Sequence, residues 1–156
     1  MMMVPMDADH LERVSAMDAE DGDVHWSRTQ FEKELGGEFR RFFVVVEESV
    51  RQPSGGLTPA VDVLAFGGYW KAGPEAQIVN IVVRKESRCL GIGKRLVEFI
   101  LDCARGEGCT VCTLEVRRTN AHAQALYKGL GFEQKGIRPK IYQDPVEDAV
   151  LMEKKL

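Results

Sequence analysis

Long apolar stretches and an export signal are both missing from this sequence of 156 residues. A helix needs roughly 20 apolar residues to cross a bilayer, and no stretch of the chain comes near that length. A signal peptide would begin with basic and then apolar residues, whereas residues 1–13 carry Asp7, Asp9 and Glu12. We therefore expect a soluble, cytoplasmic protein that does not act at a membrane.

A surplus of positive charge is also missing. The chain has 21 Lys and Arg against 24 Asp and Glu, a formal net charge of -3, with no basic tail and no long run of one sign. Proteins that bind nucleic acid draw much of their affinity from basic patches that contact phosphates. We therefore expect no nucleic-acid partner.

Cysteine and histidine are few, and they lack the spacing of a metal centre. The three histidines show no ligand pattern, and the four cysteines are Cys89, Cys103, Cys109 and Cys112. Cys109-x-x-Cys112 has the spacing of a zinc or redox pair, but there is no second ligand pair. Residues three apart on a strand also point to opposite faces. We expect reduced thiols and no metal cofactor.

Length and apolar patterning predict one domain, residues 1–156, of the α/β (α+β) class, with a mixed, mostly antiparallel central sheet flanked by helices. Internal repeats and low-complexity segments are absent. The expected helices are 9–19, 27–35, 92–105 and 120–129; the expected strands are 42–47, 61–70, 77–83, 110–116, 132–137 and 149–152, and a short strand at 3–6 is compatible with the pattern. Turn residues at 52–56 join the first two strands, and a loop with Pro139 and Pro145 separates the last two.

The segment 84–94 joins a strand to the best-defined helix and contains Gly91 and Gly93. A helix N-terminus offers unpaired N–H groups and a partial positive charge, and glycines let a phosphate approach the backbone. The segment can therefore hold a pyrophosphate. A plain tight turn into the helix is the alternative interpretation.

Two common nucleotide motifs fit this loop poorly. A dinucleotide fingerprint needs a third glycine where Leu96 stands and a shorter loop, although Glu115 supplies the acidic residue expected roughly 20 positions later. A P-loop needs Gly-x-x-x-x-Gly-Lys-[Ser/Thr], but Gly93-Lys94 is preceded by Arg88 and followed by Arg95. Neither motif is present.

The run Arg-Cys-Leu-Gly-Ile-Gly at 88–93 follows the pattern Arg-x-x-Gly-x-Gly and resembles the acetyl-CoA signature of the GNAT superfamily of acetyltransferases. Residues 113–132 are similar to the Leu-Glu-Val-Arg…Asn…Ala…Leu-Tyr…Gly-Phe block of protein N-terminal acetyltransferases of the RimI type, the ribosomal-protein-alanine N-acetyltransferases. The resemblance is strong over 79–153 and thin before. It departs at Arg84-Lys85, where the family often has Asp-Pro, and at Pro139, where a second basic or polar residue is usual.

The resemblance implies a GNAT-type enzyme that moves an acetyl group from acetyl-CoA, its co-substrate, to a protein N-terminus. A ribosomal protein that begins with alanine is the acceptor expected for the family, and we expect a monomer or a weak homodimer. Two alternatives stay open. The acceptor could be a lysine side chain or a small amine, or the chain could be a non-catalytic acyl-CoA-binding module.

The resemblance also assigns the reacting groups. Glu115 would act as the base, with a pKa raised by burial, and the phenol of Tyr127 as the acid. A solvated Glu115 paired with Arg117 and a Tyr127 that only packs in the core are the alternatives. Asn120 would bind the pantetheine arm, cap a helix, or both.

The other expected contacts are with the cofactor and the acceptor. The expected cofactor-binding residues are Ile81, Val82, Val83, Arg88, Cys89, Leu90, Gly91, Ile92, Gly93, Lys94 and Asn120. Acceptor choice is assigned to loops 18–26 and 139–148, with Trp26 and Tyr142 as substrate contacts and with Asp21, Asp23, Asp144 and Glu147 as attractors of a cationic amine.

Overall fold

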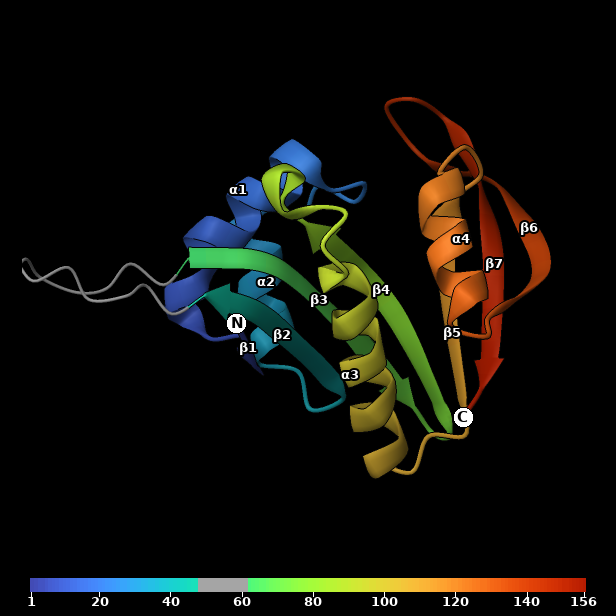
Figure 1. Ribbon diagram of the computed structural model, residues 1–156, viewed down its shortest axis with the longest axis horizontal. Coiled ribbons are helices and arrows are strands. Elements are labelled where there is room, and N and C mark those ends of the chain that lie inside the picture. Colours follow the sequence, from blue (N-terminus) through green and yellow to red (C-terminus); the bar gives the residue numbers. More distant parts are fainter. Residues whose placement is uncertain (48–61) are drawn as a thin grey trace, which may run out of the picture.

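The computed structural model describes residues 1–47 and 62–156 (Figure 1). These residues form a seven-stranded sheet in the order β1-β2-β3-β4-β5-β7-β6. The strands are β1 (Met2–Pro5), β2 (Arg40–Glu47), β3 (Asp62–Ala72), β4 (Glu75–Val83), β5 (Val111–Arg117), β6 (Glu133–Tyr142) and β7 (Glu147–Lys155). Neighbouring strands are antiparallel except β4 and β5, so the expected mixed, mostly antiparallel sheet is confirmed.

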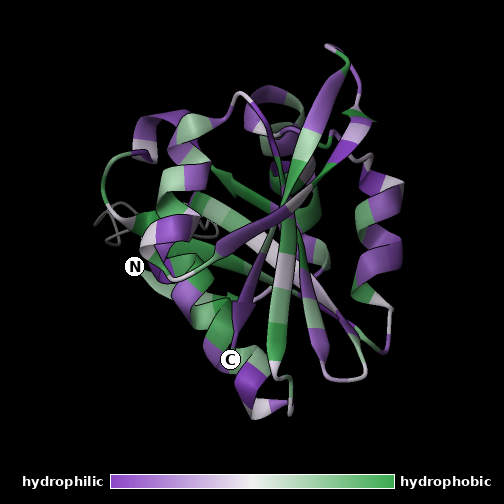
Figure 2. Cartoon of the chain, turned by 90° about the vertical axis from the view of Figure 1, so that its right-hand side faces the viewer, coloured by the Kyte–Doolittle hydropathy of each residue, from purple (hydrophilic) through white to green (hydrophobic). Residues whose placement is uncertain are grey.

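Helices cover both faces of this sheet (Figure 1). They are α1 (Leu11–Asp21), α2 (Arg28–Leu35), α3 (Ile92–Gly106) and α4 (Ala121–Gly129), with short 3₁₀ turns at Ala8–His10 and Lys85–Ser87. One hydrophobic cluster packs under α1 and α2, and a second packs under α3 and α4. Figure 2 shows apolar residues along the central strands, while the helices turn polar residues outward.

The strands of the sheet centre are buried on both faces. In β2, Phe42 and Val44 join the cluster under α1 and α2, whereas Phe43 and Val45 join the cluster under α3 and α4. Continuous apolar runs are typical of strands covered on both sides. Within residues 1–47 and 62–156, no helix has the length and apolar character needed to cross a membrane.

Element boundaries differ from expectation mainly near the C-terminus. The loop expected over 139–148 is wrong, because β6 continues to Tyr142 and β7 begins at Glu147. Pro139 lacks an N–H, and it is accommodated because β6 is an edge strand with an irregular register at this point. α1 also continues to Asp21, two residues beyond the helix expected to end at 19. The turn expected at 52–56 lies outside the described residues.

A bulge in β4 sets up the centre of the molecule. Val79 is an extra residue between Ile78 and Asn80, which pair with consecutive residues of β3. An extra residue reverses which face the following side chains occupy. Ile78 accordingly joins the cluster under α3, whereas Val82, an even number of positions later, joins the cluster under α1.

Beyond this bulge β4 and β5 separate. Their register joins 75–78 to 111–114 and then stops. Within the described part of the chain, no ladder joins residues 79–83 to residues 115–117. Figure 1 shows the two strands close at one end and apart at the other. The result is a wedge-shaped opening in an otherwise continuous sheet.

Candidate active site

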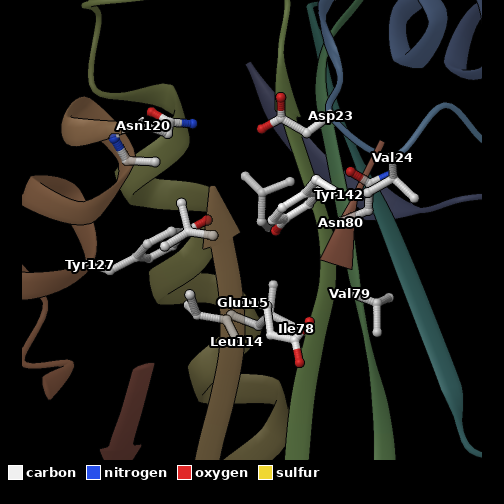
Figure 3. A pocket seen from close by; sticks show the side chains of 13 residues that line it. Asp23, Val24, Ile78, Val79, Asn80, Leu114, Glu115, Asn120, Tyr127 and Tyr142 are labelled. Atoms are coloured by element: carbon white, nitrogen blue, oxygen red, sulfur yellow. Dashed lines mark hydrogen bonds between the residues drawn. The ribbon is translucent and has the colours of Figure 1, made fainter. Parts of the chain in front are cut away.

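The opening between β4 and β5 is a cleft to which the sheet, α4 and the α1–α2 segment (residues 22–27) all contribute (Figure 3). Its walls include Asp23, Asn80, Leu114, Glu115, Asn120, Tyr127 and Tyr142. Three residues expected to act in the site, Glu115, Asn120 and Tyr127, are therefore brought together. They come from β5, the start of α4 and the middle of α4.

Tyr127 is buried at the wall formed by α4. Its ring packs edge-to-face on Phe132, with ring centroids 5.7 Å apart, and its hydroxyl points into the cleft (Figure 3). Burial raises the pKa of Tyr127, and the nearby Tyr142 and Asp23 act in the same direction. The phenol therefore stays protonated at neutral pH, while the ring also fills a place in the core.

Glu115 lies on the opposite face of β5 from the core residue Leu114. Its side chain is 18% exposed and forms an ion pair with Arg138 of β6. The expected alternative, a solvated carboxylate paired with Arg117, is wrong in its partner. Arg138 lies four positions before the expected site residue Tyr142 and was not itself recognised as a site residue, because its partner Glu115 is 23 positions away in the sequence.

Arg117 instead joins the two segments that flank the cleft. Its side chain is 9% exposed, and its guanidinium contacts Asp23 of the α1–α2 segment at 3.2 Å and Glu147 at the start of β7 at 3.3 Å. It also donates to the carbonyls of Gln143 and Pro145 and lies 4.5 Å from the ring centroid of Tyr142. Sequence reasoning treated this arginine only as a partner for Glu115, because its real partners are distant in the chain.

A second hollow adjoins the cleft on the α1–α2 side of the sheet. Trp26 and Tyr142, the two expected substrate contacts, both line it, and Trp26 stacks on Trp70 with ring centroids 6.5 Å apart. Burial raises the pKa of Tyr142 to about 12, with Asp23 contributing. The residues shared with the cleft are Asp23, Val24, Ile78, Val79, Glu115 and Tyr142.

We call this second hollow the acceptor groove. Its described lining includes the carboxylates of Asp23, Glu115 and Asp144 and no Lys or Arg. Asp23 and Glu115 are each paired with an arginine that lies outside this lining, so the groove presents carboxylate oxygens to an amine without a strong surplus of negative charge. The other two acids expected to attract an amine, Asp21 and Glu147, are not in this lining; Asp21 pairs with Arg88 and Glu147 pairs with Arg117.

Asp18 anchors the wall of the acceptor groove from inside. Its carboxylate is fully buried and accepts hydrogen bonds from the backbone N–H of Trp26 at 2.5 Å and from the side chain of Asn80 at 3.2 Å. Burial raises the pKa of Asp18. The only sequence sign of this contact is Asn80, a polar residue inside an apolar strand, which the bulge at Val79 turns toward α1.

The glycine loop meets α3 above the cleft. Cys89 and Gly91 both have positive φ, of 63° and 77°, and Gly91 starts α3 without any side chain as a cap. By contrast, Ser27 caps α2 and Asn120 caps α4. The first N–H groups of α3 are therefore left to an external partner, and that is the property of an anion site.

Space at this loop is limited at one position. A Cβ on Gly93 would lie 3.3 Å from a methyl group of Val83, whereas a Cβ on Gly91 would meet nothing within 4 Å. Leu90 is exposed, and Lys94 is exposed on the first turn of α3. The loop thus keeps its backbone accessible, as a phosphate cradle requires.

The remaining expected cofactor contacts are placed as follows. The guanidinium of Arg88 donates to the carbonyl of Val83 at 3.1 Å and pairs with Asp21 at 3.5 Å, so it ties the loop to α1. Residues 81–83 form the free edge of β4 beside the wedge. Asn120 accepts from the N–H of Ala123 at 3.1 Å, which confirms its capping role, and it also lines the cleft.

The Acetyltransferase (GNAT) family model matches residues 11–132, well over half of the chain. The chain belongs to this acetyltransferase family. A relative, the N-alpha-acetyltransferase RimI of Mycobacterium tuberculosis, is 32% identical over 135 residues, which cover 84% of this chain and 76% of the relative.

Solved structures agree with this membership. The ribosomal-protein-S18-alanine N-acetyltransferase from Escherichia coli has a TM-score of 0.80 at 27% identity, covering 99% of this chain and 92% of that one. Arabidopsis thaliana NAA60 in complex with acetyl-CoA has a TM-score of 0.85 at 17% identity, covering 99% and 98%, and supports the fold alone. The expected GNAT fold, the N-acetyltransferase class and the RimI-type resemblance are confirmed.

Proposed function

We propose that the protein transfers the acetyl group of acetyl-CoA to the α-amino group of a protein N-terminus, with a ribosomal protein that begins with alanine as the leading candidate. The observation that carries this proposal is the junction of the cleft and the acceptor groove at Glu115 and Tyr142. A donor in the wedge and an amine in the groove meet there. The names of the two RimI-type relatives support the acceptor class.

The donor side suits the parts of acetyl-CoA. The uncapped start of α3, with Gly91 and Gly93, fits a pyrophosphate, and Asn120 keeps its side-chain amide available beside the cleft. The free edge of β4 at 81–83 offers main-chain groups to the pantetheine arm. Acetyl-CoA supplies the thioester, and no metal is needed for the transfer.

The reacting groups divide the proton chemistry between them. An α-amino group has a pKa of about 8, so most of it is protonated at pH 7 and must lose a proton before it attacks. Glu115 takes that proton, directly or through a water. The neutral amine then attacks the thioester carbonyl, so that a C–N bond forms as the C–S bond breaks. The nitrogen is cationic after the attack and loses its second proton to solvent, while Tyr127 donates its proton to the departing thiolate and takes one back from solvent.

Mass spectrometry of N-terminal peptides incubated with the protein and acetyl-CoA tests the proposal. We expect acetylation at the α-amine of peptides that begin with alanine and no product when the α-amine is formylated. Acetylation of an internal lysine or of a small amine alone would support the alternative acceptor. No acetylated product from any N-terminus would refute the proposal.

We also propose that residues 1–156 act as one domain, because both hydrophobic clusters pack on the same sheet. The cytoplasmic location and the monomeric or weakly dimeric state stay predictions. A non-catalytic acyl-CoA-binding module is the less favoured function, since it gives no reason for Glu115 and Tyr127 to face one cleft.

A further inference from the structure

The partner of Glu115 reaches it from two strands away. Arg138 belongs to β6, Glu115 belongs to β5, and β7 lies between them. Nη1 of Arg138 donates to Oε1 of Glu115. This is the only ion pair that Glu115 makes within residues 1–47 and 62–156.

The register explains how the arginine crosses the sheet. Arg138 pairs with Ala149 of β7, and Glu115 pairs with Leu151, so all four residues share one face and the two charged residues are diagonal neighbours. Ala149 is small and buried, and Gly136 stands opposite Leu151 on β6. The long side chain of Arg138 therefore crosses β7 next to the small Ala149 and reaches the carboxylate.

The nearer arginine does not compete for this carboxylate. Arg117 pairs with the same Ala149 from the β5 side, but its guanidinium is occupied by Asp23, Glu147 and two main-chain carbonyls. Each of the two carboxylates at the junction of cleft and groove, Asp23 and Glu115, thus has an arginine of its own. Arg138 is therefore the cation whose contact fixes the position of the Glu115 carboxylate.

We propose that Arg138 is a positioning residue for acetyl transfer: it holds Oε1 of Glu115 and so leaves Oε2 directed at the acceptor amine. This inference rests on the proposed function. It also suggests a role for the irregular register between Arg138 and Tyr142, where four positions along β6 correspond to two positions along β7. That irregularity lets one edge strand supply both Arg138 and Tyr142 to the site.

The proposal can be tested without unfolding the protein. The side chain of Arg138 is 55% exposed although that of Glu115 is 18% exposed, so its removal takes no packing from the core, and an ion pair with one partner in solvent contributes little to the free energy of folding. Arg138→Gln should therefore fold with an unchanged melting temperature and an unchanged Kd for acetyl-CoA. Lys135→Gln is the matched control, because Lys135 is another exposed cation of β6 and pairs with Glu133, away from the groove.

The experiment is a double-mutant cycle of Arg138→Gln and Glu115→Gln, with kcat and the peptide KM measured for all four proteins. We expect Arg138→Gln to lower kcat by about 10-fold, since a misplaced catalytic group costs on this order or more. Arg138→Lys should restore part of the loss. In the Glu115→Gln background, Arg138→Gln should have no further effect on kcat, because the group it positions is gone.

Several outcomes would overturn the inference. The first is that Arg138→Gln and Lys135→Gln have the same kcat, and the second is that the kcat of Arg138→Gln exceeds that of the wild type. The third is that Arg138→Gln lowers kcat by the same 10-fold in the wild-type and in the Glu115→Gln background. A change confined to the peptide KM would also overturn it, because Arg138 would then bind the acceptor. Assays of the wild-type protein distinguish failure of this inference from failure of the proposed function. If the wild-type protein acetylates a lysine or a small amine instead of an N-terminus, the proposed function fails, but the role of Arg138 can still be tested by measuring the cycle with that amine.

Discussion

The two sides of the reaction centre are built from different parts of the chain. On the donor side, the groups that face the cleft are mainly backbone: the free edge of β4 and the uncapped start of α3. On the acceptor side they are side chains held by other side chains, such as Glu115 by Arg138 and Asp23 by Arg117. Backbone sites depend on local dihedral angles, whereas side-chain sites depend on individual residues far apart in sequence.

This contrast has a simple consequence for substitutions. On the acceptor side, replacing the side chain that is proposed to react should cause a large loss of kcat. On the donor side Tyr127 is the one side chain proposed to react, and other changes there should matter only where they alter the path of the main chain. Loss of an exposed charge on that side should matter little. The following predictions test this contrast in order of decreasing effect.

Glu115→Gln should lower kcat by about 10³-fold, because general-base catalysis commonly contributes 10² to 10⁴. The Kd for acetyl-CoA, measured by calorimetry, should not change, because Glu115 is proposed to act on the acceptor amine and not to hold the cofactor. Glu133→Gln serves as the control, since Glu133 is exposed and pairs with Lys135. A kcat within a few-fold of wild type would rule out Glu115 as the base.

Tyr127→Phe should lower kcat by about 10²-fold, within the range of general-acid catalysis. Tyr69→Phe is a matched control, because the Tyr69 hydroxyl donates to Glu107 outside the cleft. It should change the melting temperature but not kcat.

The direction of the Tyr127 shift adds a pH test. A raised pKa means that the phenol keeps its proton above its ordinary value of 10. Wild-type kcat should therefore not fall between about pH 8 and 10 through deprotonation of this phenol. A fall in kcat over that interval that Tyr127→Phe abolishes would contradict the shift.

Gly91→Ala should weaken acetyl-CoA binding by about 10-fold. Alanine adopts a φ of 77° only at a cost of roughly 1.4 kcal/mol, and this cost is subtracted from the free energy of binding if the loop must take that conformation to bind acetyl-CoA. Gly106→Ala changes a glycine of the same helix at a site with open space and no positive φ. It should stabilise the protein slightly and leave binding intact. Equal Kd values for the two variants would show that the loop conformation is not needed.

Arg88→Gln should change the Kd for acetyl-CoA by less than about 3-fold, because the guanidinium is engaged by Asp21 and Val83 and half-exposed pairs are worth little. Titration at two salt concentrations measures this. A loss above 10-fold that shrinks at high salt would show instead that Arg88 contacts the phosphates, as the sequence pattern suggested. The donor side would then also depend on a side-chain charge.

Much of the fold was predictable because its signals are local. The amphipathic pattern of α3, the Ser27 and Asn120 caps and the apolar run of β2 each lie within a short stretch of chain. The bulge at Val79 was not predictable, because the alternation of buried and half-buried residues along β4 continues through it and only the polar Asn80 marks the place. The extension of β6 past Pro139 was missed for a related reason: an edge strand tolerates a residue that a central strand would exclude.

The sequence by itself indicated the glycine loop of the donor side and the two groups proposed to react, Glu115 and Tyr127. A glycine with positive φ and an uncapped helix start are properties of a short stretch of chain. Tertiary structure alone decided the acceptor side, since Arg117 meets Asp23 across 94 positions and Arg138 meets Glu115 across 23. Ion pairs form between whichever charges the sheet brings within reach, and strand order and register, set by packing of the whole core, decide which ones those are.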